Sequence, residues 1–189
     1  MSLNSVRIIG GEWRRRILRF PDSEGLRPTP DRVRETVFNW LGQDLTGLRC
    51  LDLFAGSGAM GFEAASHGAE TVVMVEQAPK VFAALQENAR LLDPSGRLRT
   101  IRGDAVKCAS LLAGEGLRFD VLFLDPPYKQ GWIERLVPLF PALVADDGVI
   151  YIEAEQAFDA LGNWQTVRSG RAGQVFYHLM RSGTTHGAE

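Results

Sequence analysis

The chain has 189 residues, of which 45% are hydrophobic and 23% are charged, as in an ordinary globular protein with a substantial core. It has neither an apolar run of about 18 residues nor an apolar signal region, so we expect a cytoplasmic protein without a membrane span. A net charge of −2 excludes a uniformly basic nucleic-acid binder, and the isolated Cys50 and Cys108 lack the spacing of metal ligands, so no metal site is expected.

The N-terminal segment is locally basic, with eight arginines and five acidic residues among residues 1–35. Two strand-like runs, at 6–9 and 17–20, flank Gly10-Gly11 and predict a β-hairpin. Four arginines beside Trp13 are typical of a phosphate-contacting surface, although a solvated basic hairpin has the same pattern. They are Arg14, Arg15, Arg16 and Arg19.

A loop and a helix follow this hairpin. Thr29 is predicted to cap the helix, with Pro30 at its first position. Apolar residues at 33, 37, 40 and 41 recur at helical spacing, and Gly42 can end the helix. We therefore predict an N-terminal extension over 1–47, made of a hairpin and a helix, ahead of a main domain over 48–189.

Strands and helices alternate after residue 48, which predicts parallel strands with helices on both faces. A glycine-containing turn at 169–173 divides the tail into two strand-like runs and favours an antiparallel hairpin. We therefore predict an α/β, Rossmann-like fold with a mostly parallel seven-stranded sheet that ends in an antiparallel C-terminal hairpin. The predicted strands before the tail span 49–54, 71–76, 98–102, 119–124 and 147–153, and the helices span 58–67, 79–92, 105–113 and 131–144.

A glycine turn between the first of these strands and its helix predicts a cofactor site. Gly56, Gly58 and Gly61 fit the pattern G-x-G-x-x-G in the strand–turn–helix context that this motif requires. Glu76 ends the next strand, 20 positions after Gly56, where a carboxylate can accept from ribose hydroxyls. Together these residues indicate an adenosine-containing cofactor.

Two aspartates refine this prediction. Asp52, at the end of the first strand, would oppose the pyrophosphate of a dinucleotide but suits the sulfonium and ammonium groups of S-adenosylmethionine. The alternative is that Asp52 only caps the turn. Asp104 follows a strand and can accept from the adenine amino group, cap the helix at 105–113, or do both.

The sequence Asp125-Pro126-Pro127-Tyr128 ends the apolar run 119–124. Two prolines cannot continue a strand, so the strand must stop there, at the usual position of a ligand crevice in an open α/β sheet. Asp125 offers an acceptor for an N–H group and Tyr128 a flat aromatic face, as binding of a planar amino-heterocycle requires. A turn that happens to contain Asp and Tyr is the alternative.

In this order the motifs resemble those of class I S-adenosylmethionine-dependent amino-methyltransferases: DLFAGSG at 52–58, Glu76, Gly103-Asp104 and DPPY at 125–128. Three further segments resemble the RsmD family, which methylates the 2-amino group of a guanine in 16S ribosomal RNA. They are RIIGG at 7–11, LRPTPDRVRE at 26–35 and FNWL at 38–41.

The resemblance implies roles for residues along most of the chain. Asp125, Pro126 and Tyr128 would act on the base, and Arg14, Arg15, Arg16 and Arg19 would contact RNA. Thr29 and Arg32 would close over the methionine end of the cofactor. S-adenosylmethionine would be held by these two and by Asp52, Phe54, Gly56, Gly58, Glu76, Asp104 and Asp125. The implied partner is 16S ribosomal RNA, within the small subunit or an assembly intermediate, and we expect a monomer.

Three alternatives stay open at this point. A DNA adenine-N6 methyltransferase uses the same DPPY chemistry, but the continuous core leaves no room for a target-recognition insert. A cofactor-binding or RNA-binding protein without catalysis is opposed by the intact Asp125 and Tyr128. A nicotinamide-dependent oxidoreductase is opposed by Asp52.

Glu153, which ends the fifth predicted strand near the same crevice, is either structural or in contact with the base.

Overall fold

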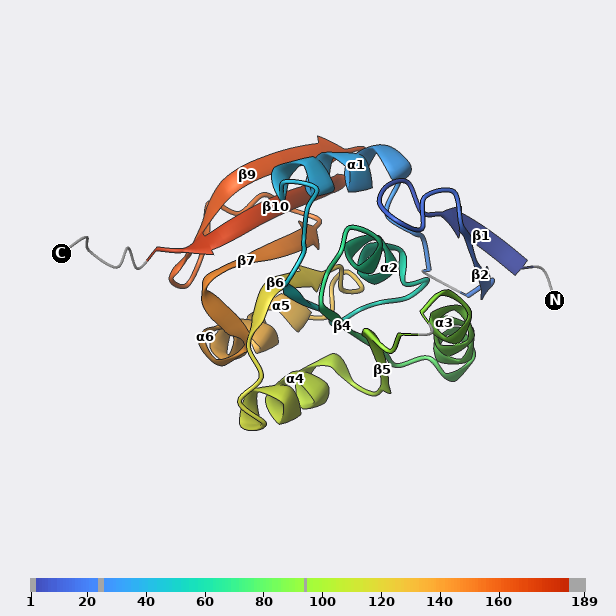
Figure 1. The fold of residues 1–189 in the computed structure, drawn as a ribbon. Coiled ribbons are helices and arrows are strands. Elements are labelled where there is room, and N and C mark those ends of the chain that lie inside the picture. The colour runs from blue at the N-terminus through green and yellow to red at the C-terminus, as the bar shows by residue number, and fades with distance from the viewer. Residues whose placement is uncertain (1–2, 24–25, 94, 184–189) are drawn as a thin grey trace.

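The computed structural model describes residues 3–23, 26–93 and 95–183. An eight-stranded sheet with helices on both faces lies beside a separate two-stranded hairpin (Figure 1). The hairpin strands are β1 (Leu3–Arg7) and β2 (Ile17–Pro21). The strands of the large sheet are β3 (Arg49–Asp52), β4 (Thr71–Glu76), β5 (Leu98–Arg102), β6 (Phe119–Leu124), β7 (Val144–Ala154), β8 (Ala160–Leu161), β9 (Trp164–Ala172) and β10 (Val175–Ser182).

The strand order β5-β4-β3-β6-β7-β10-β9-β8 confirms the predicted fold class, but the sheet has eight strands rather than the predicted seven, because the two-residue strand β8 adds to its edge. The first five strands of this order are parallel, and β10 runs antiparallel to both β7 and β9. The chain leaves β3 towards one edge and returns to add β6 on its other side. The order therefore reverses between β3 and β6, and ligands bind at the carboxyl ends of the strands at such a point.

The helices are α1 (Asp31–Trp40), α2 (Ala59–Ser66), α3 (Pro79–Leu92), α4 (Ala105–Gly114), α5 (Trp132–Leu136) and α6 (Phe140–Leu143), with a 3-10 turn η1 (Val137–Leu139). The prediction of one helix over 131–144 is wrong. Pro138 and Pro141 lack the backbone N–H that a helix interior needs, so three short pieces replace it. The helix at 79–92 and the strands at 71–76, 98–102 and 119–124 are confirmed at both ends. No described helix is long and apolar enough to cross a membrane.

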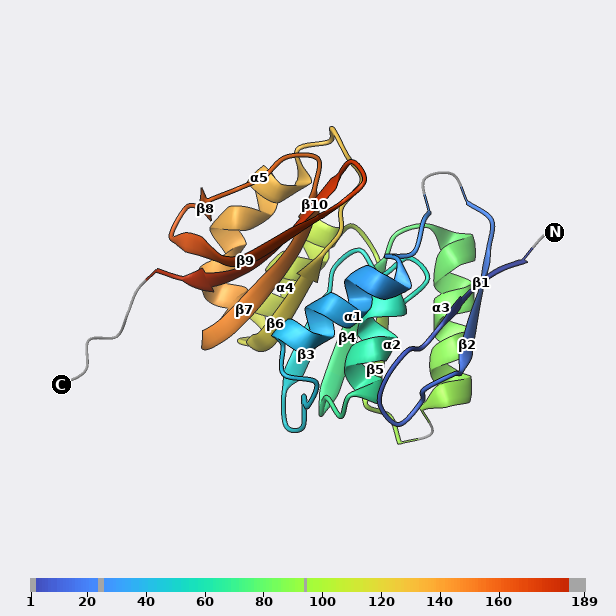
Figure 2. The ribbon, with the colours of Figure 1, turned by 90° about the horizontal axis from the view of Figure 1, so that it is seen from above.

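Two apolar clusters fill the two sides of the large sheet. One lies under α4, α5 and α6 and includes Phe119, Leu122 and Phe140. The other lies under α1, α2 and α3 and includes Phe38 and Phe62. Residues of the hairpin, such as Phe20, belong to this second cluster, so the hairpin shares a core with the large sheet. The hairpin lies beside α3 (Figure 2).

The hairpin forms as predicted, but its connection differs. Gly10-Gly11 does not make a tight turn, because the strands pair only up to Arg7 and Ile17. The nine intervening residues form a loop that packs against α2. A Cβ atom on Gly11 would lie 1.9 Å from the Ser66 carbonyl oxygen, so the close approach of the two backbones requires glycine here.

Candidate functional site

The glycine turn connects β3 to α2 and lies against the end of β4. Gly56 and Gly58 have φ angles of 52° and 82°, in the left-handed region that favours glycine. The Gly56 N–H donates to Glu76 Oε2 at 2.9 Å, and the Ala78 N–H donates to Oε1 at 2.7 Å. The structure therefore brings Glu76 to the turn, as the spacing predicts. A Cβ atom on Gly61 would lie 2.5 Å from Met74 Sδ, so the third glycine serves helix–strand packing.

Asp52 is buried at the carboxyl end of β3, next to this turn. The side chain is 3% exposed and accepts the Phe54 N–H at 3.3 Å. Burial raises the pKa of Asp52 to about 7, and the charges of Glu76 and Glu153 contribute in the same direction. The aspartate helps to fix the turn, and its buried carboxyl group is also available to a ligand.

Asp125 and Glu153 follow the same positions on two neighbouring parallel strands. Leu124 of β6 pairs with Ile152 of β7, so the next residue on each strand is a carboxylate. Burial raises the pKa of Asp125 well above its ordinary value, and the charges of Glu153 and Asp52 add to this effect. Three acidic side chains thus gather at the carboxyl ends of β3, β6 and β7.

These carboxylates form no ion pair with any residue in the described part of the chain. Uncompensated negative charge in a buried crevice is costly, and a cation that enters the crevice would offset that cost. The three carboxylates attract the positively charged sulfonium and ammonium groups of S-adenosylmethionine, whereas they would repel a negatively charged pyrophosphate. Among the described residues, no group of three or more His, Cys, Asp or Glu side chains is arranged to hold a metal ion.

This crevice predicts a pH-dependent effect of cofactor on stability. Between about pH 4 and 7 folded Asp52 holds a proton that the unfolded chain has released, so the free energy of unfolding without cofactor falls as pH rises. Above about pH 7 Asp52 is charged in both states, and a cationic ligand then relieves the most repulsion. We expect S-adenosylmethionine to raise the melting temperature more at pH 8 than at pH 6. The difference should be about 2–4 °C for each ~1 kcal/mol by which the cofactor stabilises the folded protein more at pH 8. The D52N variant should lose most of this difference, and equal shifts at both pH values in the wild type would contradict the assignment.

Asp104 caps α4, as one of its two interpretations predicted. Its Oδ1 atom accepts the backbone N–H groups of Val106 and Lys107, both at 3.0 Å. Both hydrogen bonds go to Oδ1, so Oδ2 stays available as an acceptor. Contact with an adenine amino group stays a prediction.

The loop after β6 forms one wall of a pocket. Pro126, Tyr128, Trp132, Glu153 and Phe158 are among the residues that line this pocket of about 210 Å³. Tyr128 is 40% exposed, and burial together with nearby acidic groups raises the pKa of its hydroxyl to about 12. Tyr128 therefore stays neutral at physiological pH and presents an aromatic ring near the carboxylates of Asp125 and Glu153.

Thr29 does not cap α1, and that prediction is wrong. The helix begins at Asp31 after Pro30, which has no side chain that can cap. The Thr29 hydroxyl instead donates to Glu153 Oε1 at 2.7 Å, so this segment reaches the carboxylate cluster. Arg32 is exposed in the first turn of α1.

The predicted arginine cluster is exposed, but it lies away from the carboxylates. Arg14, Arg15 and Arg16 belong to the loop that contacts the C-terminal end of α2, and Arg19 is exposed on β2. The helix begins at the glycine turn, and its eight residues separate the two regions by about 12 Å. Trp13 is buried, with the Arg97 guanidinium 5.1 Å from its ring centroid, so its predicted place on an exposed phosphate-contacting surface is wrong.

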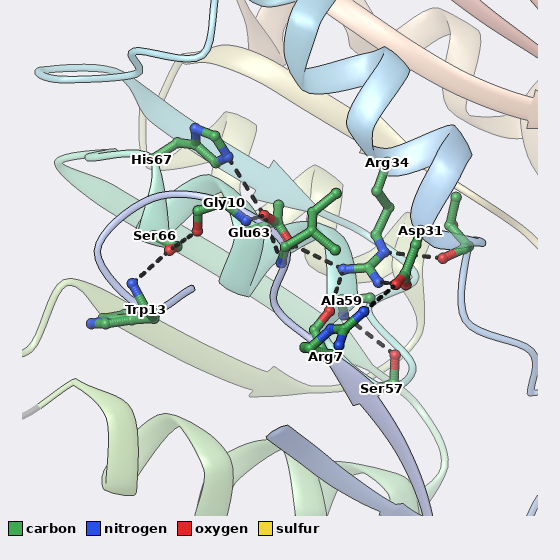
Figure 3. Close-up of polar contacts among 12 residues, drawn as sticks. Arg7, Gly10, Trp13, Asp31, Arg34, Ser57, Ala59, Glu63, Ser66 and His67 are labelled. Carbon is green, nitrogen blue, oxygen red and sulfur yellow. Dashed lines mark hydrogen bonds and ion pairs between the residues drawn. The ribbon is translucent and has the colours of Figure 1, made fainter. Parts of the chain in front are cut away.

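Sequence reasoning missed a buried ion pair, Arg34–Glu63, which joins the N-terminal loop, α1 and α2 (Figure 3). Both side chains are fully buried, with Arg34 Nη1 2.9 Å from Glu63 Oε2. Glu63 also accepts the N–H groups of Ile9 and Gly10, and Arg34 Nε donates to the Thr29 carbonyl at 3.1 Å. The pair therefore anchors the segment whose hydroxyl binds Glu153. The only signal in the sequence was that Arg34 and Glu63 are charged residues on the apolar faces of α1 and α2.

The comparisons with known proteins agree over nearly the full chain. The profile of the family described as Conserved hypothetical protein 95 matches residues 6–181. The Ribosomal RNA small subunit methyltransferase D of Escherichia coli K12 is 42% identical over 179 residues, 92% of this chain and 88% of that protein. The protein of the same name from Haemophilus influenzae is 36% identical, over 94% of each chain. The solved structure of yhhF from Escherichia coli has a TM-score of 0.83 at 38% identity and covers 95% of this chain and 98% of that one.

Proposed function

Because the chain belongs to the Conserved hypothetical protein 95 family, whose RsmD relatives cover nearly all of it, we propose that it is an S-adenosylmethionine-dependent ribosomal RNA methyltransferase. Its acceptor is the exocyclic 2-amino group of a guanine in 16S ribosomal RNA. The observation that carries this proposal is the position of Asp125 and Tyr128, on the loop after β6 and beside buried carboxylates that lack a cation.

The chemistry of the acceptor explains why these residues are needed. The lone pair of the guanine 2-amino group is delocalised into the ring, so the amine is a poor nucleophile. Asp125 and the Pro126 carbonyl accept its N–H groups and thereby localise the lone pair and orient it. Tyr128 stacks on the base, an interaction of about 1–3 kcal/mol in other base–aromatic contacts. The base must leave its stack to enter the pocket, so positioning and preorganised polar groups supply most of the protein's contribution.

The cofactor binds at the glycine turn. When bound, S-adenosylmethionine supplies a methyl group on a sulfonium, and the neutral thioether S-adenosylhomocysteine is a good leaving group. Asp52 and Asp125 provide the negative charge that favours this cation, and Glu76 accepts from the ribose hydroxyls. Gly56 and Gly58 let the backbone approach, Phe54 and Asp104 border the adenine, and Thr29 and Arg32 cover the methionine end.

The N-terminal extension is the RNA-contacting surface in this proposal. Arg14 and Arg15 line a second pocket of about 500 Å³, together with Arg7 and residues of α1 from Asp31 to Asn39. This pocket extends from the arginine cluster towards Asp31, next to the segment that contains Thr29. A ribosomal RNA is large enough to contact both regions at once. We further propose that the enzyme acts as a monomer in the cytoplasm on the small ribosomal subunit or on an assembly intermediate.

Neutralising the cluster should weaken RNA binding without loss of fold. Replacement of Arg14, Arg15 and Arg16 by glutamine should lower affinity for 16S RNA about uniformly across sequences. The slope of log K against log salt should fall by about one for each phosphate that the variant no longer neutralises. Arg168 is exposed on β9, which lies towards the edge of the sheet opposite to β5 and the hairpin (Figure 2), and provides a matched control as R168Q. Equal affinities and slopes for the triple variant and R168Q would remove the cluster from the RNA-binding surface.

Acceptor choice separates this function from DNA adenine methylation. Labelled methyl transfer would be measured to undermethylated small subunits, naked 16S RNA and adenine-rich duplex DNA. We expect label in the subunit or its RNA and none in DNA, because short loops connect β3 to β10 and no DNA-reading insert is present among the described residues. Label in DNA alone would favour the alternative.

A further inference from the structure

Glu153 is a buried carboxylate that the transfer described above leaves without a role. The side chain is 6% exposed and lies beside Asp125, one residue beyond the Leu124–Ile152 pair. Paired residues of neighbouring parallel strands point to the same face, as the Phe123 and Tyr151 rings confirm with centroids 6.2 Å apart. Adjacent strands lie about 4.8 Å apart, so the two carboxylates form a pair of neighbouring acceptors.

Only one oxygen of Glu153 is used within the protein. Thr29 Oγ1 donates to Oε1 at 2.7 Å, and the Tyr151 hydroxyl donates to the same atom at 2.9 Å. Oε2 accepts no hydrogen bond from the described residues. Among those residues, the fully buried side-chain atoms that lack a hydrogen-bond partner are Arg97 Nε and His178 Nδ1. Oε2 is not one of them, so it is accessible to solvent. Because Glu153 also lines the pocket beside Tyr128, Oε2 is the acceptor that a ligand in this pocket can use.

Two neighbouring acceptors match the edge of guanine and oppose that of adenine. Guanine presents N1–H beside its 2-amino group, so two donors lie side by side. Adenine presents an unprotonated N1 beside its 6-amino group, and a carboxylate would repel that lone pair. A site that leaves a buried polar group unpaired rejects the wrong ligand strongly.

We propose that Glu153 selects guanine by accepting N1–H with Oε2 while Asp125 accepts from the 2-amino group. This inference rests on the proposed function and adds a specificity-determining residue to it. Burial raises the pKa of Glu153, and the two hydroxyl donors hold the side chain in place and act in the opposite direction, in favour of its ionised form. Arg34 contributes from a distance, since it holds the Thr29 carbonyl.

The test compares guanine with 2-aminopurine at the acceptor position of a 16S RNA fragment, once that position has been mapped. 2-Aminopurine keeps the 2-amino group but has an unprotonated N1. For the wild type we expect kcat/KM to be at least about tenfold lower with 2-aminopurine, the size of a lost hydrogen bond to a charged group. In E153Q the amide oxygen can still accept from Thr29 and Tyr151, and the amide N–H₂ replaces Oε2. This variant should lose at least about tenfold with guanine, and its preference for guanine should disappear or reverse.

Two controls keep the outcomes distinct. S-adenosylhomocysteine should raise the melting temperature of E153Q as much as that of the wild type. Y151F, which removes one donor and keeps the Glu153 carboxylate, should retain the guanine preference. A wild type that methylates 2-aminopurine as well as guanine, or an E153Q variant with an unchanged preference, would overturn the role of Glu153 alone. A wild type that transfers no methyl group to guanine would overturn the proposed function, and this inference with it.

Discussion

Replacement of Asp125 by alanine is expected to lower methyl transfer by at least about 10²–10³-fold, the usual effect of removing one preorganised polar group at a reacting centre. In the proposed mechanism Asp125 is the acceptor that orients the amine, and the neighbouring carboxylates cannot replace it from their positions. Affinity for S-adenosylmethionine should fall far less than the rate of transfer, because Asp52 still provides negative charge for the cation and Glu76 still accepts from the ribose. The measurement is single-turnover transfer, with cofactor affinity determined separately by calorimetry.

The D125N variant is the matched comparison. Its amide keeps an acceptor oxygen and loses the charge, so it should keep more activity than D125A. Neither variant should be less stable than the wild type, because burial, together with the charges of Glu153 and Asp52, opposes ionisation of Asp125 in the folded protein. Near-normal turnover by D125A would show that the assigned role of Asp125 is wrong.

Replacement of Arg34 by methionine is expected to destabilise the protein by about 3–5 kcal/mol, since Glu63 would remain as a buried charge without its partner. Glu63 still accepts two backbone N–H groups from the N-terminal loop, but these groups carry no full charge, and His67 Nε2, 3.5 Å from Glu63 Oε1, offsets the charge only when His67 is protonated. The free energy of unfolding from urea titration measures the loss. The double variant R34M/E63Q should recover part of it, because no unpaired charge is left.

An exposed arginine provides the control for this experiment. Arg7 lies 3.6 Å from Asp31, and both side chains are more than half exposed. R7M should therefore cost about 0–1 kcal/mol. If R34M and R7M lost equal stability, the Arg34–Glu63 pair would not anchor the N-terminal loop.

Features set by short segments could be predicted from the sequence. The glycine turn follows from three glycines after an apolar strand, and the end of β6 follows from two consecutive prolines. The same reasoning should have divided the segment 131–144, since Pro138 and Pro141 are visible in the sequence. The predicted helix over 79–92 agrees with α3 at both ends.

Contacts between distant segments could not be predicted. Thr29 and Glu153 are 124 positions apart, and their hydrogen bond depends on how α1 packs across the sheet. Local sequence instead favoured Thr29 as a helix cap, because a threonine before Pro-Asp has the pattern of a helix start. Trp13 was expected on an exposed basic surface, but the docking of its loop on α2 buries it. No local pattern encodes such long-range packing.

The identity of the methylated nucleoside tests the central claim most directly. After transfer from labelled S-adenosylmethionine to undermethylated small subunits or their 16S RNA, the product would be digested to nucleosides and separated by chromatography with mass detection. The structure predicts label in 2-methylguanosine. Label in 6-methyladenosine, or in a guanosine methylated on a ring nitrogen, would contradict an exocyclic guanine amine as the group that Asp125 orients.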